Sequence, residues 1–264
     1  MRAAACGLQP RTAMLRSMRP AFTLLIVAAA CGGPHAGPPA NHAGGAGGDG
    51  LVATITPFTG TAPAGEDLGE ATIRTPLIDV PGNPAASAAI NAALDVPNTA
   101  AALAEVKELG EVGLDYEVGF NRRGVLDLSI THETMGAYPD SYRSHFLFDL
   151  ATGKKLTGAE LLRADRQADL AARLDTQLQA ELADARAHAD ADCIGDGDDP
   201  YQGRFTPDLL GDVGVGDTGL VFVYDFDFPH AIQACEPAGG VYVVPWAEAG
   251  PFLVAGTAVA ALAP

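Results

Sequence analysis

The chain has 264 residues, of which 33 are acidic and 16 basic, so its formal net charge is -17. This length allows one large domain with a substantial hydrophobic core, and a hydrophobic content of 48% excludes a wholly disordered chain. Because nucleic acids and anionic membrane surfaces are negatively charged, the acidic balance argues against both as the main partner.

The first 30 residues have the pattern of a secretory signal peptide. Four arginines precede an uncharged run from Ala21 to Ala30, and the segment contains no acidic residue. This run is too short to cross a bilayer as a helix, which needs about 20 residues. It leads into the sequence Ala28 to Gly32, which resembles a bacterial lipobox. We therefore expect a lipid on Cys31; the alternative is an ordinary signal peptide that is cut elsewhere.

Processing at this point alters the charge and leaves a flexible tether. Translation starts at Met1 or Met14, and in either case removal of residues 1–30 leaves 12 basic and 33 acidic groups, a net charge of -21. Residues 32–50 contain eight Gly and three Pro, a composition typical of a tether. No Asp follows Cys31 as an inner-membrane retention signal. The expected location is therefore the cell envelope, lipid-anchored, at the outer membrane of a Gram-negative bacterium.

The cysteines predict one disulfide. Cys6 precedes the cleavage point and Cys31 is assigned to the lipid, so Cys193 and Cys235 remain. Outside the cytoplasm, two cysteines without CxxC spacing favour a structural bridge. A reactive thiol is the alternative.

Residues 51–264 show the mixed periodicity of an α+β domain. In chain order, the patterns predict a strand over Thr72–Val80, helices over Pro84–Leu94 and Ala100–Leu109, a hairpin of Val112–Phe120 with Val125–Thr131, a strand over Ser141–Leu150, a helix over Asp165–Ala189, strands over Leu220–Phe228 and Val241–Trp246, and a helix over Trp246–Leu253. Thr157 and Glu160 form a predicted capping box. The predicted architecture is antiparallel hairpins forming a sheet that packs against one long helix and shorter helices.

The alternation of side chains assigns the two faces of the hairpin. In its first strand Leu114, Tyr116, Val118 and Phe120 are expected on one face. In its second strand Leu126, Leu128 and Ile130 are expected opposite Asp127 and Ser129. The long helix carries leucine at every fourth position from Leu170 to Leu182, which indicates a face packed against a sheet.

Three stretches of the sequence resemble the RsiV-like domain, a bacterial extracytoplasmic domain. They are the strand and turn Tyr142–Thr157 with its Asp-Leu-Ala-Thr-Gly-Lys sequence, the phrase Gly219–Asp225, and the ending Val243–Glu248. The resemblance spans about Ala71 to Leu253. The family includes the lysozyme-sensing region of the anti-sigma factor RsiV and domains in front of some peptidoglycan deacetylases. It implies an α+β fold at the cell envelope and, in its best-understood member, binding of lysozyme.

One loop differs from the family pattern and is the candidate contact surface. Members often carry Gly-Gly-Ala-His between the middle strands, where this chain has Met135 to Pro139. We expect the neighbouring Gly136, Tyr138 and Tyr142 to form a binding loop, because aromatic side chains often anchor interfaces. The transmembrane helix and the sigma-binding segment of an anti-sigma factor have no counterpart in the sequence, so that regulatory role is not expected here.

The matches to catalytic motifs are incomplete, and the chain is not expected to be an enzyme. Gly214–Gly219 matches GxGxxG, but a strand follows where a dinucleotide site needs a helix, so a turn between strands is expected. His145 has no ligand spacing and is expected to be a surface or hydrogen-bonded core residue. An acidic stretch has the oxygen ligands that calcium takes: Asp190, Asp192, Asp196, Asp198 and Asp199. The alternative is a solvated acidic loop, and no other cofactor is expected.

Three functions follow in order of preference. The first is a lipid-anchored binding module for a lysozyme-like protein or for peptidoglycan, with no nucleic-acid partner. The second is a structural envelope lipoprotein. The third is a wall-polymer hydrolase or deacetylase with an unrecognised site, which would need clustered carboxylates in a cleft.

Overall fold

The structure is a computed structural model, and it describes residues 50–63, 70–96, 98, 111–135, 139–190, 193, 199–226, 228, 232 and 235–264. The predicted signal peptide, Cys31 and nearly all of the tether lie outside these residues. So does the helix predicted over residues 100–109. Among the described residues, no helix combines the length and the apolar character needed to cross a membrane.

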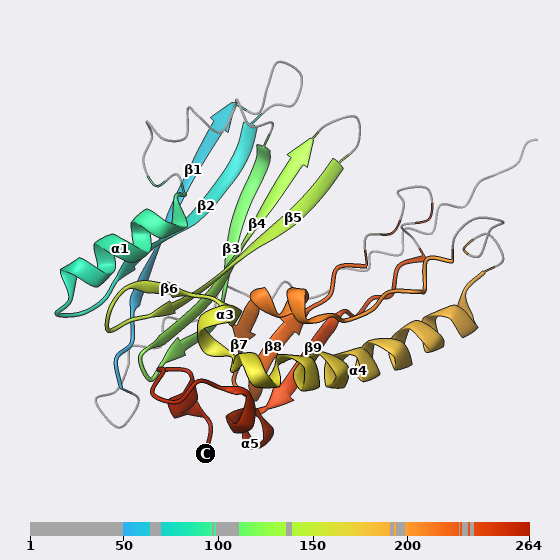
Figure 1. The fold of residues 1–264 in the computed structure, drawn as a ribbon. Coiled ribbons are helices and arrows are strands. Elements are labelled where there is room, and N and C mark those ends of the chain that lie inside the picture. The colour runs from blue at the N-terminus through green and yellow to red at the C-terminus, as the bar shows by residue number, and fades with distance from the viewer. Residues whose placement is uncertain are drawn as a thin grey trace, which may run out of the picture. The chain divides into compact units, whose positions relative to one another are not determined.

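A six-stranded sheet occupies the first half of the described chain (Figure 1). Its strands follow one another in sequence order: β1 (Thr54–Pro63), β2 (Glu70–Asp79), β3 (Glu111–Arg122), β4 (Val125–Met135), β5 (Pro139–Asp149) and β6 (Lys154–Leu156). All neighbours are antiparallel except β2 and β3, which run parallel.

Helix α1 (Pro84–Leu94) covers one face of this sheet. It begins where the sequence provides both a cap and a preset backbone. The Asn83 side chain accepts a hydrogen bond from the Ala86 N–H, and Pro84 occupies the first turn. Ile90 and Leu94, one turn apart, are buried in a cluster with residues from β2, β3, β4 and β5. The boundaries predicted for this helix are confirmed.

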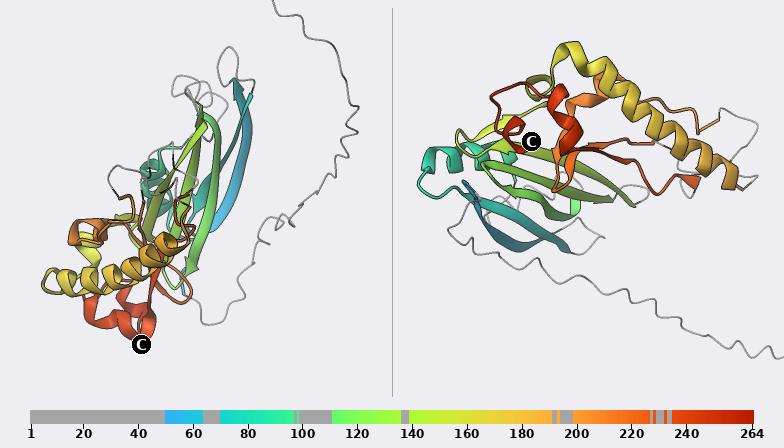
Figure 2. Two further views of the ribbon diagram at one scale, coloured as in Figure 1. Left: turned by 90° about the vertical axis from the view of Figure 1, so that its right-hand side faces the viewer. Right: turned by 90° about the horizontal axis from the view of Figure 1, so that it is seen from below.

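A second, smaller sheet and the long helix occupy the second half of the chain. The elements are α3 (Gly158–Leu161), η2 (Ala164–Arg166), α4 (Gln167–His188), η4 (Pro207–Gly211), β7 (Val213–Val215), β8 (Gly219–Val223), β9 (Val241–Pro245), α5 (Trp246–Ala249), η6 (Gly250–Phe252) and η7 (Ala260–Leu262). Strands β7, β8 and β9 form an antiparallel sheet in that order. Figure 2 shows α4 alongside this sheet from two further sides.

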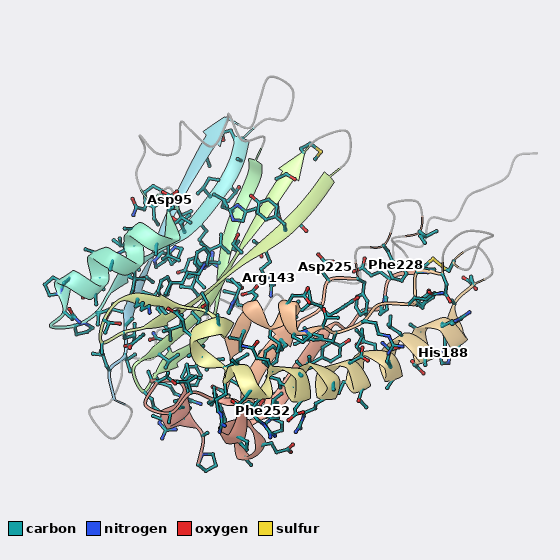
Figure 3. All side chains as sticks on the ribbon, viewed as in Figure 1. Asp95, Arg143, His188, Asp225, Phe228 and Phe252 are labelled. Carbon is teal, nitrogen blue, oxygen red and sulfur yellow. A yellow bond between two sulfur atoms is a disulfide. The ribbon has the colours of Figure 1, made fainter. Side chains whose placement is uncertain are left out.

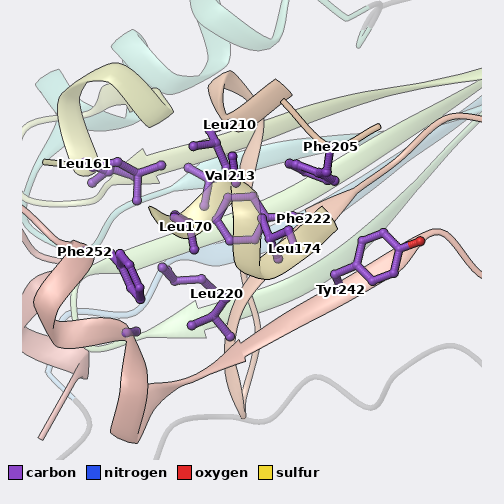
Figure 4. Packing of buried hydrophobic residues seen from close by; sticks show 14 of the residues in the cluster. Leu161, Leu170, Leu174, Phe205, Leu210, Val213, Leu220, Phe222, Tyr242 and Phe252 are labelled. Carbon is purple, nitrogen blue, oxygen red and sulfur yellow. The ribbon is translucent and has the colours of Figure 1, made fainter. Parts of the chain in front are cut away.

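The leucines of α4 form the core between the helix and the small sheet. Leu170 and Leu174 are fully buried against Leu220 and Phe222 of β8 (Figure 4). The four-residue leucine repeat therefore packs as predicted. The capping box also forms at the start of α3, where the Glu160 carboxylate accepts a hydrogen bond from the Thr157 N–H. The α+β class is confirmed, with two sheets instead of the single sheet of antiparallel hairpins that the sequence predicted.

A β-bulge in β3 overturns one predicted face. Leu114 contributes to the cluster beneath α1, whereas Phe120 belongs to the cluster beneath α4. The register of β3 against β4 shifts between Val118 and Phe120, and this shift turns Phe120 to the other side of the sheet. Phe120 was therefore placed wrongly on the face of Leu114.

Strand ends differ from the prediction in the second half of the chain. Strand β8 ends at Val223, five residues before the predicted end at Phe228. The short strands β6 and β7 and the N-terminal strand β1 were not predicted. In contrast, the turn between β7 and β8 forms where the GxGxxG match was interpreted as a turn, and there the Gly216 N–H donates to the Gly219 carbonyl over 2.9 Å.

Candidate functional site

A polar cluster that is buried at Asp127 and exposed at Asp212 joins the two sheets, and it is centred on His145 of β5. The imidazole bonds through Nε2 to Asp127 Oδ2 of β4 at 2.9 Å and through Nδ1 to Asp212 Oδ1 at 2.8 Å. Asp212 lies between η4 and β7, so its bond crosses to the second sheet. Asp127 makes a second crossing, because its carboxylate accepts a hydrogen bond from the Val215 N–H over 2.7 Å. We call Asp127, His145 and Asp212 the His145 cluster.

Glycines leave the space for this cluster. Asp127 is 6% exposed. A Cβ added at Gly119 would stand 2.8 Å from Asp127 Oδ1, and one at Gly214 would stand 3.3 Å from both Asp127 Oδ2 and His145 Nε2. Side chains at either glycine would therefore crowd the carboxylate or the imidazole. Gly214 is the first glycine of the GxGxxG match. The short distances show that its role here is to let the backbone pack closely against the cluster.

The His145 cluster is an ion-pair bridge. Burial alone lowers the pKa of His145, but hydrogen bonds and charge interactions with Asp127 and Asp212 outweigh this effect and raise the pKa to about 9. The hydrogen bond from His145 is in turn the largest cause that lowers the pKa of Asp212. At neutral pH the imidazole is thus protonated and donates from both nitrogens. It has no free lone pair with which to accept a proton as a general base.

The sequence contained only part of the signal for this cluster. The sequence predicted a surface or hydrogen-bonded core histidine, and His145 is a partly buried residue with two hydrogen-bond partners. Asp127 and Ser129 were expected on the polar face opposite Leu126, and they do lie opposite it, but both are buried. The second sheet covers Asp127, because the Val215 N–H of β7 bonds to its carboxylate, and alternation within one strand cannot reveal such a cover.

The end of the β4–β5 hairpin presents a stacked aromatic pair. Tyr142 is 52% exposed, and its ring is stacked on His132 with a centroid distance of 4.4 Å and an interplanar angle of 5°. The two residues are cross-strand partners in the ladder between β4 and β5. Of the predicted binding loop, Tyr142 is therefore exposed at the hairpin end, whereas Gly136 and Tyr138 lie outside the described residues. Beside it, Arg143 forms an ion pair with Glu117 at 3.7 Å.

The structure joins the predicted pair of cysteines (Figure 3), whereas most of the predicted calcium ligands lie outside the described residues. Cys193 and Cys235 form the predicted disulfide, with Cα atoms 5.7 Å apart. For the calcium hypothesis, Asp192, Asp196 and Asp198 lie outside the described residues. Asp199 forms an ion pair with Arg186 at 2.7 Å. Within the described residues no three His, Cys, Asp or Glu side chains converge as metal ligands, so the calcium site stays a prediction.

The likeness of this chain to known proteins lies in its fold. No protein-family model matches its sequence, and a search of curated proteins finds no match. Its fold is similar to that of DUF3298 family proteins. A DUF3298 family protein from Pseudomonas aeruginosa PAO1 shares 15% identity with a TM-score of 0.52, over 78% of this chain and 96% of that one. A second member, from Bacteroides fragilis, shares 13% identity with a TM-score of 0.50, over 81% and 98%. At these identities the similarity concerns the fold.

Proposed function

We propose that this protein is a lipid-anchored binding module of the bacterial cell envelope that captures a basic protein of the lysozyme kind. The observation that carries this proposal is the stacked pair of Tyr142 and His132. The Tyr142 ring is exposed to solvent, and one of its faces stacks on the His132 ring. An aromatic ring that is ordered before binding loses little conformational freedom when a partner covers it, and such rings are frequent interface anchors.

Charge supports a basic partner. The processed chain would carry a net charge of -21, since cleavage removes four arginines and no acid. An excess of this size attracts a basic protein over a Debye length of about 8 Å at physiological salt and speeds its encounter. The resemblance to the lysozyme-sensing domain, together with the DUF3298 fold, supports the same class of partner.

The N-terminal segment supports the location. A lipid on Cys31 would hold the protein at a membrane, and the 19 residues 32–50 would separate the domain from it. A Gly-rich tether of this length has a root-mean-square end-to-end distance of roughly 25 Å. The domain would therefore reach a soluble partner without contact with the lipid headgroups.

Binding of the full-length protein in detergent micelles tests the proposal. We expect immobilised wild-type protein to retain a basic lysozyme at moderate salt, and the variant Tyr142→Ala to bind at least about tenfold more weakly. Leu77→Ala is the matched control, because Leu77 of β2 is also an exposed apolar side chain, at 44%, and lies on a different strand.

Three outcomes would contradict the proposal or one of its parts. Retention of neither lysozyme nor isolated peptidoglycan sacculi would remove the binding function itself. Retention of sacculi without lysozyme would keep a binding function but replace the protein partner with a wall glycan. Equal losses in Tyr142→Ala and Leu77→Ala would show that Tyr142 is not the anchor.

A further inference from the structure

Strand β9 is an outer strand of the small sheet. Two hydrogen bonds that flank its ladder with β8, in the same register, identify which backbone groups point away from β8. The Tyr224 N–H donates to the Gly240 carbonyl over 2.8 Å, and the Trp246 N–H donates to the Thr218 carbonyl over 3.0 Å. Both bonds connect even-numbered residues. In an antiparallel ladder, hydrogen-bonded pairs recur at every second residue, so the even-numbered residues of β9 face β8.

The odd-numbered residues of β9 therefore present an open edge. The N–H and C=O groups of Val241 and Val243 point away from β8, and only Pro245 at the end of the strand lacks an N–H. In the described part of the chain, no hydrogen bond to these edge groups is present. A row of unpaired strand groups is a template for a further strand.

The side chains beside this edge are apolar and uncovered. Val223 of β8 and Val241 of β9 are direct cross-strand partners, and they are 57% and 59% exposed. They stand on the sheet face opposite the buried Tyr242 and Val244, which pack in the cluster beneath α4. A strand added at this edge would place its own side chains beside Val241 and so reduce the exposure of that valine.

The other sheet edges carry features that block pairing. Strand β1 has Pro57 within it, and β6 is three residues long with Lys154 and Lys155. Strand β7 is turned toward the large sheet, where the Val215 N–H is already bonded to the Asp127 carboxylate. Proline, short length, lysine and an internal partner are the usual means of protecting an edge. Strand β9 has only its terminal proline.

We propose that β9 pairs with β9 of a second copy of this chain, antiparallel about a two-fold axis at Tyr242. In this register Val241 of each copy lies opposite Val243 of the other, and each such pair exchanges its N–H and C=O groups. The two three-stranded sheets become one continuous sheet, and the exposed valines of both copies adjoin across the axis. The contact is isologous, so it closes as a dimer.

A second copy of this chain provides the same open strand edge and the same exposed valines. The edge is complementary to its own reverse in hydrogen bonding, and the valines match one another. The strong negative charge of each copy opposes association, and salt screens this repulsion. Because the paired strand has five residues, we expect a concentration-dependent dimer that strengthens as ionic strength rises.

Native mass spectrometry of the full-length protein released from detergent micelles measures this equilibrium. We expect a dimer for wild-type protein and at least a tenfold weaker dimer for Val241→Lys, which adds a charge at the exposed edge. Leu77→Lys, an exposed apolar position on the large sheet, is the matched control and should remain dimeric. A wild-type chain that stays monomeric at every concentration, or a dimer that Val241→Lys leaves intact, overturns the proposal.

Crosslinking tests the register independently of dimer strength. Val241→Cys and Val243→Cys proteins are prepared separately and then oxidised alone or as a mixture. In the proposed register a cysteine at 241 faces a cysteine at 243 only when the two variants associate, so covalent dimers should form in the mixture and not in either sample alone. Crosslinks in a single variant, or none in the mixture, contradict the pairing.

Discussion

The His145 cluster predicts a specific dependence of stability on pH. The pKa of His145 is raised from 6.5 to about 9 in the folded chain. A raised pKa means that the folded state holds the proton more tightly than the unfolded state, by about 1.4 kcal/mol for each unit by which the two pKa values differ. The cluster should therefore contribute about 3 kcal/mol to the free energy of unfolding below pH 6.5, and this contribution should vanish as the pH rises through 9.

The variant His145→Gln isolates this contribution. Glutamine can still donate a hydrogen bond to Asp127 but does not titrate. Urea unfolding, followed by the fluorescence of Trp246, gives the free energy of unfolding of both proteins at several pH values. We expect wild type to exceed the variant by about 3 kcal/mol more at pH 6 than at pH 9.5. A difference that is constant across this range would refute the assignment of a protonated bridge between the sheets.

Further variants test the packing beneath α4 and the contribution of the disulfide. Leu174→Ala should lower the free energy of unfolding by about 2–5 kcal/mol because it leaves a cavity at a fully buried site. The exposed Leu209→Ala should change it by less than about 0.5 kcal/mol, and equal effects in denaturant titrations would contradict the packing. Replacing Cys193 and Cys235 together by serine should cost about 4 kcal/mol in the chain-entropy model, since the bridge closes a loop across 42 positions. If the serine variant and wild type have the same unfolding midpoint, the disulfide adds no stability.

Local signals in the sequence were sufficient for several elements. The helix α1 was found with its boundaries because Pro84 starts it and the apolar spacing from Ile90 to Leu94 continues it. The leucine repeat of α4 and the β3–β4 hairpin were also predicted. In each of these cases the residues that determine the element lie within a few turns or one hairpin of each other.

Features that depend on distant residues were missed. Asp127 is 18 positions from His145, and Asp212 is 67 positions away. The residue types alone did not indicate this convergence, because it depends on how the two sheets meet. The parallel pairing of β2 with β3 likewise joins strands separated by α1. The bulge at Val118–Phe120 shifts the register by a single residue, which apolar periodicity does not report.

The central strands serve two layers at once, and this has a consequence for cooperativity. Leu126 and Phe148 support the layer beneath α1, whereas their sequence neighbours Val125 and Leu147 support the layer beneath α4. If the layer on one face of β4 and β5 separated, the apolar side chains on that face would become exposed. These same strands support the layer on the opposite face. The two halves should therefore unfold in a single transition, with their slowest amide exchange in β4 and β5.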